Sequence, residues 1–244
     1  AEGQENIINL LRCAWAGSQK YGALVWSGDI KSSFPSMKNQ VAAGLNMGIA
    51  GIPWWTTDIG GFFGANINDP EFHELLVRWF EYGCFCPVMR LHGYRWPLQP
   101  QYGTTGGATC VSGAPNEVWS YTDQVCEILS DYLRLRERML PYITELMEEA
   151  HEKGTPVMRP LFYDFPEDKE SWNVETEYMF GPKVLVKPIT DADARETDVY
   201  LPGGASWTNA WTGETFEGGQ KVHVAAPIEQ IPLFTRDGYK LPMK

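Results

Sequence analysis

Four polar side chains that could take part in chemistry each follow a short apolar run of the sequence. The runs are residues 7–11, 23–26, 47–52 and 85–89, and the side chains after them are Arg12, Asp29, Asp58 and His92. Cleavage of a glycosidic bond uses one carboxylic acid to protonate the leaving oxygen and a second carboxylate as nucleophile or base. Two aspartates with an arginine and a histidine therefore suit the hydrolysis of a glycoside.

Each of these side chains also has a purely structural interpretation. Asp29 could cap the following helix, as Ser32 or Ser33 could, and Asp58 could stabilise a turn. His92 could be a hydrogen-bonded core histidine, and Arg12 could pair with any nearby carboxylate. In parallel α/β folds, however, functional residues collect where strands end, at one edge of the sheet. This shared placement favours one site over four unrelated structural roles.

Motifs of other enzyme classes are missing from the sequence. Gly60-Gly61 does not form a dinucleotide-binding fingerprint, and neither a phosphate-binding loop nor the G-x-S-x-G motif of a serine nucleophile is present. No group of residues has the spacing of metal ligands. The sequence therefore predicts no metal and no cofactor.

Composition excludes some partners and suggests another. The net charge of -11 argues against nucleic acid and anionic membrane surfaces, which are bound through Lys and Arg. No apolar run reaches the roughly 18 residues of a membrane span. The ten Trp, eleven Tyr and eleven Phe are mostly expected in the core, although aromatic faces also stack on sugar rings. The favoured partner is an oligosaccharide or glycoside substrate.

Strands and helices are predicted to alternate over the first 155 residues. Apolar residues at helical spacing follow residue 36, and Asp69-Pro70 supplies the start of a second amphipathic helix. A longer helical region covers 116–153, with an interruption at Pro141 and an end at Gly154. This order is typical of βαβ units on a parallel sheet.

The pattern changes near residue 156, where a small antiparallel β domain is predicted to begin. Residues 183–187, 197–201 and 221–224 are short alternating runs bounded by Gly and Pro. The predicted domains are therefore 1–155 and 156–244. Five cysteines without framework spacing indicate free thiols in a reducing compartment, which predicts a cytoplasmic protein. The chain begins without Met, which indicates a piece of a longer protein.

The residues at the predicted strand ends belong to longer motifs that resemble glycoside hydrolase family 31, and most of all its bacterial α-xylosidases and α-glucosidases. The likeness extends over essentially the whole chain and into the β domain. The motifs are RCAWAGSQKYG (12–22), WSGD (26–29), WWTTDIGGF (54–62), RLHG (90–93), MRPLFYDFP (158–166) and YMFGP (178–182).

This resemblance implies a role for each site residue. Asp29 corresponds to the general acid/base of a retaining α-glycosidase, and Trp26 to a wall of the subsite for the non-reducing sugar. Phe62 matches an aromatic wall position. Three further residues match those that hydrogen-bond sugar hydroxyls or orient the acid: Arg12, Asp58 and His92.

The implied fold is the second half of a (β/α)8 barrel followed by a small antiparallel β-sandwich domain. In the family the nucleophilic aspartate lies on an earlier strand, in a motif such as W-x-D-x-x-E, and nothing before Arg12 matches it. The missing N-terminal half of the barrel is therefore an expected partner, because an open half barrel exposes strand edges. The sequence leaves room for an oligomer as well.

The resemblance implies part of a retaining α-glycosidase that hydrolyses terminal non-reducing α-xylosyl or α-glucosyl residues. This chain would carry the acid/base but not the nucleophile, so the chain alone is expected to be inactive. Two alternatives stay open from the sequence. One is a non-catalytic carbohydrate-binding or regulatory remnant, and the other is a different α-glycoside, such as a galactoside or a sulfonated sugar.

Overall fold

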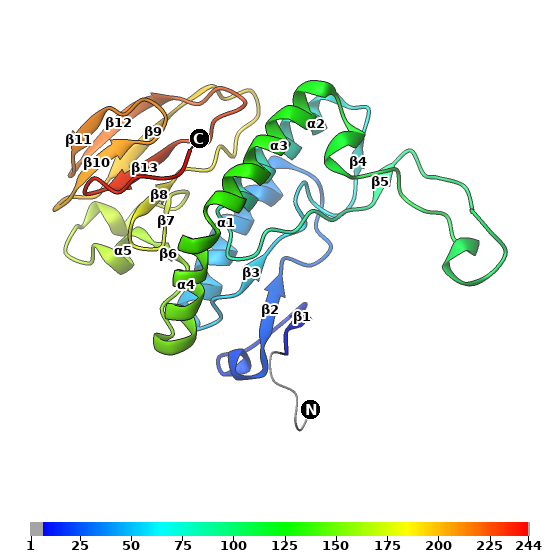
Figure 1. Ribbon diagram of the computed structural model, residues 1–244, viewed down its shortest axis with the longest axis horizontal. Coiled ribbons are helices and arrows are strands. Elements are labelled where there is room, and N and C mark those ends of the chain that lie inside the picture. Colours follow the sequence, from blue (N-terminus) through cyan, green and yellow to red (C-terminus); the bar gives the residue numbers. More distant parts are fainter. Residues whose placement is uncertain (1–6, 244) are drawn as a thin grey trace.

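The computed structural model describes residues 7–243, and its first layer is a parallel sheet of three strands. The strands lie in chain order, with Leu11 opposite Val25 and Trp26 opposite Thr56. Helix α1 connects the second strand to the third, and α2 follows the third (Figure 1). The bounds are β1 (Asn9–Leu11), β2 (Ala23–Trp26), α1 (Phe34–Ile49), β3 (Trp55–Thr56) and α2 (Pro70–Cys84).

Both helices begin at side chains that cap them. Ser33 accepts a hydrogen bond from the Ser36 amide at 3.3 Å, and Asp69 accepts one from the Glu71 amide at 3.0 Å. Each side-chain oxygen satisfies an amide that has no partner within its helix. Ser33, rather than Asp29, is therefore the cap of α1. The predicted start of α2 at Asp69-Pro70 is confirmed.

Two of the predicted strands are wrong. Residues 47–49 belong to the end of α1, and the strand lies farther along as β3. A short apolar run fits a buried helix end as well as a strand, so its periodicity could not decide. Residues 85–88 form a turn followed by bends. The Val88 amide donates to the Trp55 carbonyl of β3 at 3.1 Å, whereas Pro87 has no amide hydrogen to donate. The Arg136 guanidinium also donates hydrogen bonds to the carbonyls of Cys84, Cys86 and Pro87, which are therefore not free to pair with a neighbouring strand.

The long helical region is divided in two, as predicted from Pro141. Helix α3 spans Asp123–Arg138 and α4 spans Leu140–Lys153, with the proline in the first turn of α4. Gly154 ends α4 with a φ of 72°, which a residue with a side chain rarely adopts. The region begins later than residue 116 because Thr122 caps α3 through its hydroxyl.

The rest of the chain is antiparallel, as predicted. A six-stranded sheet has the order β11-β10-β13-β8-β7-β6, and β9 pairs with β12. Side chains from both layers, including Leu185, Val199 and Trp207, share a buried cluster. The bounds are β6 (Met158–Pro160), α5 (Leu161–Asp164), β7 (Tyr178–Phe180), β8 (Val184–Val186), β9 (Glu196–Leu201), β10 (Ser206–Asn209), β11 (Thr215–Glu217), β12 (Gln220–Ala225) and β13 (Leu233–Arg236).

The larger hydrophobic core takes in residues from both predicted domains. Trp79 of α2, Leu129 of α3 and Phe180 of β7 all belong to it. The division of the chain at residue 156 stays a prediction, since this core is continuous across it. Within residues 7–243, no helix is long and apolar enough to cross a membrane.

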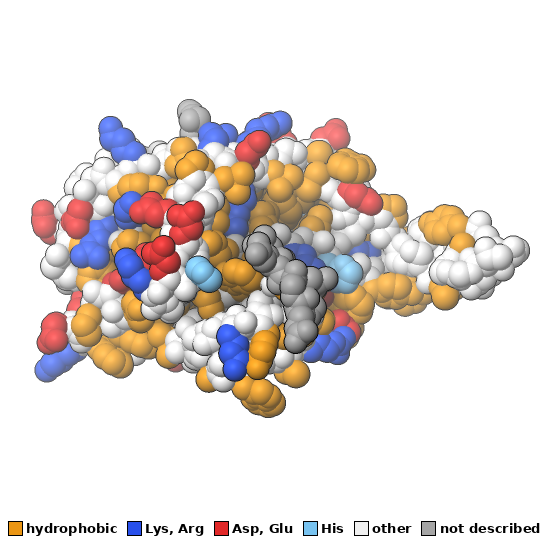
Figure 2. All heavy atoms as spheres, turned by 60° about the horizontal axis from the view of Figure 1, so that its bottom comes forward, with side chains coloured by type: hydrophobic (Ala, Val, Ile, Leu, Met, Phe, Trp, Pro, Cys, Tyr) orange, Lys and Arg blue, Asp and Glu red, His pale blue; other side chains and the backbone are white. Residues whose placement is uncertain are grey.

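A long arm, residues 97–115, projects from the helical layer (Figure 1). It follows β5 (Arg95–Trp96), which pairs with β4 (Ala65–Asn66). The arm contains no charged residue, and Figure 2 shows it as a protrusion of apolar and uncharged polar groups. Its base lies next to the loops that follow the parallel strands, because the Tyr94 amide donates to the Phe62 carbonyl at 2.6 Å.

A buried arginine ties α2 to the β domain. Arg78 is fully buried, and its guanidinium lies 3.2 Å from the equally buried Glu81. Burial raises the pKa of Glu81 to about 8, and Arg78 opposes this rise. The Arg78 guanidinium also donates to backbone carbonyls of the loops before β9 and after β12, at 2.7 to 3.4 Å, namely those of Ala194, Ala226, Pro227 and Gln230.

Replacing Arg78 with methionine should lower the free energy of unfolding by about 3–5 kcal/mol, because it removes the cation beside the buried Glu81, which keeps only its hydrogen bond from the Tyr132 hydroxyl, and the donor to the Ala226 carbonyl. Chemical denaturation measures the change. Arg134→Met is the control, since that arginine pairs with Asp131 in solvent and should contribute less than about 1 kcal/mol. Equal losses in the two variants would contradict this role for Arg78.

Candidate active site

The three parallel strands direct their following residues to one edge of the sheet. Arg12 comes directly after β1, Asp29 comes three residues after the end of β2, and Asp58 comes two residues after β3. The loops beyond the strands stay side by side. The Phe62 amide donates to the Ile30 carbonyl at 2.7 Å, and the Ile59 amide donates to the Arg90 carbonyl at 3.3 Å. This pairing holds the loops of the site together.

Asp29 forms an ion pair with Arg12. The guanidinium Nη2 donates to Asp29 Oδ2, and its carbon lies 5.5 Å from the centre of the Trp26 ring. The side chains of Arg12 and Asp29 are 61% and 38% exposed. The structure therefore brings three predicted site residues into one contact group, and leaves the carboxyl group of Asp29 accessible to a ligand.

Asp58 lies in a different environment, because it is fully buried. Its Oδ1 accepts a hydrogen bond from Arg90 Nη1, while its Oδ2 has no partner among the described residues. Burial raises the pKa of Asp58; the charges of Arg90 and His92 lower it, and the charge of Asp29 raises it further. Asp58 also lies beside the His92 segment, because its neighbour Ile59 forms a parallel β-bridge with Leu91. A buried acceptor without a partner is costly and is rare in folded proteins.

His92 and Phe62 form an aromatic group beside these charges. Their ring centres are 5.6 Å apart, and Phe62 also stacks on Tyr94 at 6.4 Å. His92 is exposed, so its interpretation as a core histidine is wrong. Five of the six predicted site residues are thus found on the loops that follow the parallel strands and the segment beside them, and the sixth, Trp26, is the last residue of β2.

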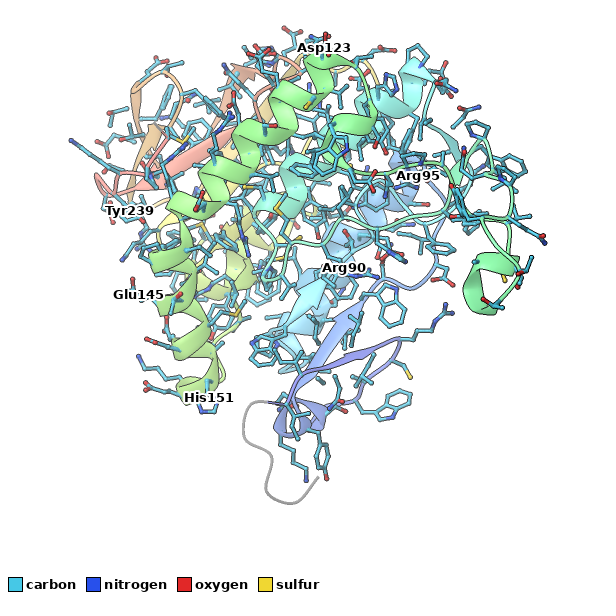
Figure 3. The ribbon with its side chains drawn as sticks, turned by 45° about the vertical axis from the view of Figure 1, so that its right-hand side comes forward. Arg90, Arg95, Asp123, Glu145, His151 and Tyr239 are labelled. Atoms are coloured by element: carbon cyan, nitrogen blue, oxygen red, sulfur yellow. The ribbon has the colours of Figure 1, made fainter. Side chains whose placement is uncertain are left out.

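Two arginines of this region were missed by the sequence reasoning. Arg90 is the ion-pair partner of Asp58 and lies two residues before His92 in the motif RLHG. Its place in the same motif as a predicted site residue could have indicated its role. Arg95 is fully buried, and its contacts with the site loops become apparent only in the folded structure. Figure 3 shows Arg90 near the end of the parallel sheet and Arg95 near the base of the arm.

Metal ligands do not gather here or elsewhere in residues 7–243, where no group of three or more His, Cys, Asp or Glu side chains could hold an ion. The chemical groups of the site are two carboxyls, two guanidiniums, an imidazole and aromatic faces. Carboxyl and guanidinium groups form charge-assisted hydrogen bonds with hydroxyl groups. Aromatic rings add apolar faces, so the set suits a polyhydroxylated ligand.

Comparison with known proteins identifies the class. Residues 1–146 match the glycosyl hydrolases family 31 TIM-barrel domain, and residues 154–241 match the glycosyl hydrolase family 31 C-terminal domain. The chain belongs to glycosyl hydrolase family 31. The resemblance stated from the motifs is therefore confirmed, and the fold combines TIM-barrel and C-terminal domains of this family.

Particular relatives include α-xylosidases. An α-xylosidase of Saccharolobus solfataricus is 39% identical over 99% of this chain and 31% of its own length. Neutral α-glucosidase C of Homo sapiens is 35% identical over 100% of this chain and 24% of its own length. A crystal structure of a family 31 α-xylosidase from a soil metagenome, complexed with xylose, is 55% identical with a TM-score of 0.93, and the match covers 98% of this chain and 36% of that one. The chain spans about a quarter to a third of the length of these relatives.

Proposed function

We propose that this chain is the acid/base-carrying part of a retaining α-glycosidase that removes terminal non-reducing α-xylosyl or α-glucosyl residues. Residues 1–155 would form the second half of a (β/α)8 barrel, and residues 156–244 a β-sandwich domain. The observation that carries the proposal is the exposed Asp29 carboxyl, held by Arg12 at the edge where Asp58 and Arg90 also lie.

Asp29 would act as the general acid and base. Proton transfer to a leaving oxygen needs a carboxyl that the substrate can reach, and Asp29 is the accessible one of the two aspartates. Arg12 would bind a sugar hydroxyl through its free donors, since a guanidinium has five. Trp26, under the Arg12 guanidinium, would supply an apolar wall for the sugar.

Asp58 would bind the sugar rather than attack it. Its carboxylate is fully buried and engaged by Arg90, so it cannot approach an anomeric carbon as a nucleophile must. Its unpartnered Oδ2 would instead accept a hydrogen bond from a sugar hydroxyl. His92 and Phe62 would complete the wall. The nucleophilic carboxylate would come from the N-terminal half of the barrel.

Of the two proposed substrate classes, α-xylosides are favoured over α-glucosides. The soil-metagenome structure that is 55% identical to this chain contains xylose, whereas a Flavobacterium johnsoniae dextranase structure complexed with glucose is 32% identical with a TM-score of 0.83. The greater likeness to a xylose-binding protein supports this order.

The proposal is tested by joining this chain to the N-terminal part of the soil-metagenome α-xylosidase. This chimera should hydrolyse an aryl α-D-xyloside with retention of anomeric configuration, while the 244-residue chain alone should not. Nuclear magnetic resonance of the first-formed sugar shows the configuration. A folded chimera that binds xylose without cleaving the xyloside would favour a non-catalytic sugar-binding protein, and one that does neither would refute the proposal.

A further inference from the structure

Arg95 is a buried cation at the point where the loops of the site meet. Its side chain is completely buried, and its guanidinium donates hydrogen bonds to several oxygens. The Nη1 atom lies 2.7 Å from the Gly61 carbonyl and 3.3 Å from Ser32 Oγ. The Nη2 atom lies 3.1 Å from the Ile59 carbonyl and 3.4 Å from the His92 carbonyl.

These acceptors belong to the three segments that carry the proposed site. Ile59 directly follows Asp58, and Ser32 lies three residues after Asp29. His92 itself supplies one of the carbonyls. One guanidinium therefore connects the loop of the proposed acid, the loop of the buried aspartate and the segment of the histidine, without touching the carboxyl groups themselves.

Arg95 forms no direct ion pair with a carboxylate among residues 7–243. The ring centre of Phe72 is 4.8 Å from its guanidinium carbon. Its Nε atom donates to Asn116 Oδ1 at 3.1 Å. Burial of a charge in this way is costly and lowers the pKa of Arg95; carbonyl and side-chain oxygens, an aromatic face and the more distant charge of Asp58 oppose this. The guanidinium thus adds a side-chain connection to the backbone hydrogen bonds that hold these loops together.

Glycines give the guanidinium its space. A Cβ atom on Gly93 would lie 2.3 to 2.5 Å from the guanidinium, and one on Gly60 would lie 2.9 Å from its Nη2 atom. A Cβ on Gly61 would lie 2.6 Å from the Ser32 Cα, so the loops after β2 and β3 approach each other too closely for a side chain at this position. The surroundings are thus fitted to an arginine and to directly packed loops.

We propose that Arg95 is a positioning residue, which fixes the loops after β2 and β3 and the His92 segment in the geometry that binds the sugar. This inference rests on the proposed function. Sugar-binding groups on separate loops must be held closely, because a displacement of about 1 Å can cost 10²-fold in rate. Lysine at this position would keep the charge but lose the planar fork that reaches several acceptors at once.

The test compares Arg95→Lys with Arg78→Lys in the chimera. Arg78 is a matched control, because it is equally buried and donates to several backbone carbonyls, but those carbonyls belong to the β domain. Both variants should lower the thermal unfolding midpoint. Only Arg95→Lys should raise the Kd for xylose or glucose, measured by calorimetry, and the KM for an aryl α-xyloside, each by tenfold or more.

Two outcomes overturn the inference, and they are distinguishable. If Arg95→Lys and Arg78→Lys bind xylose and glucose equally well, Arg95 has only a structural role and the proposed function is unaffected. If the unmodified chimera binds neither sugar, the proposed function fails, and this inference fails with it. Should Arg95→Lys not fold, Gly93→Ala replaces it, because the added Cβ displaces the guanidinium without removing its charge, and the same rise in Kd is expected.

Discussion

Replacing Asp29 with asparagine in the chimera should lower kcat/KM for an aryl α-xyloside with a poor leaving group about 10²- to 10⁴-fold, the usual contribution of a general acid. Asparagine keeps the shape of the side chain but cannot donate the proton. For a substrate with a dinitrophenyl leaving group, which needs little protonation, the rate of the first step should fall far less. Steady-state and burst kinetics with a series of aryl xylosides measure this dependence on the leaving group.

Asp131→Asn is the matched control for this prediction. Asp131 is also an exposed aspartate paired with an arginine, but it lies on α3 and not at the sheet edge. Its substitution should leave every rate unchanged. Losses in the Asp29 variant that are the same for good and poor leaving groups would show that Asp29 binds the substrate and does not transfer a proton to it.

The sequence predicted the ends of β1 and β2 because they are marked by local signals. An apolar four-residue run, of which Ala23 and Val25 are buried, ends at Trp26, and Ser-Gly follows it. Residues 47–52 and 85–89 carry equally apolar runs, but tertiary contacts decide their structure. Gly48 lies in α1, and its lack of a side chain lets the Met158 carbonyl of β6 pack against the helix. The Arg136 guanidinium donates hydrogen bonds to the carbonyls of Cys86 and Pro87 after α2. Such partners, distant in sequence, cannot be inferred from periodicity.

The same distinction explains the site. Asp29 was predictable because it follows β2, and parallel strands bring such residues to one edge. Asp58 also lies at this edge, although it follows β3 and not the run of residues 47–52 that was predicted as its strand. Their different burial was not predictable, since it depends on how the loops pack. Neither were the partners Arg90 and Arg95, because Arg90 contacts Asp58 from 32 positions away and Arg95 contacts Ser32 from 63 positions away. The order of strands in the sequence indicates which residues reach the edge of the sheet. The packing of the loops decides which side chains they contact there and which of them a ligand can reach.

Asp58→Asn in the chimera should weaken the binding of xylose or glucose about 10- to 150-fold, because a hydrogen bond to a charged group contributes about 1.5–3 kcal/mol. Asparagine can still accept a hydrogen bond from Arg90, but it offers the sugar a neutral partner. Calorimetric titration of both sugars measures the change in Kd. Unchanged binding would remove Asp58 from the sugar site.

The same variant should not lose stability at neutral pH, and this separates a binding role from a structural one. Burial raises the pKa of Asp58 above 3.8, so its contribution to stability is fully present below pH 3.8 and is lost as the pH rises through the raised pKa. Asparagine lacks this pH-dependent cost. The unfolding midpoint of Asp58→Asn relative to the unmodified chimera should therefore increase from pH 4 to pH 7.

Asp164→Asn provides the control that completes this comparison. Asp164 lies in the β domain, its pKa is raised by burial, it pairs with Arg159 at 3.1 Å, and its Oδ2 also lacks a partner among the described residues. The variant should show the same direction of change in stability with pH and no change in sugar binding. Burial raises the pKa of both aspartates, so both variants should respond to pH in the same direction. Only sugar binding should distinguish Asp58 from Asp164. If both variants weakened sugar binding equally, a general loss of order would explain the result better than a contact between Asp58 and the sugar.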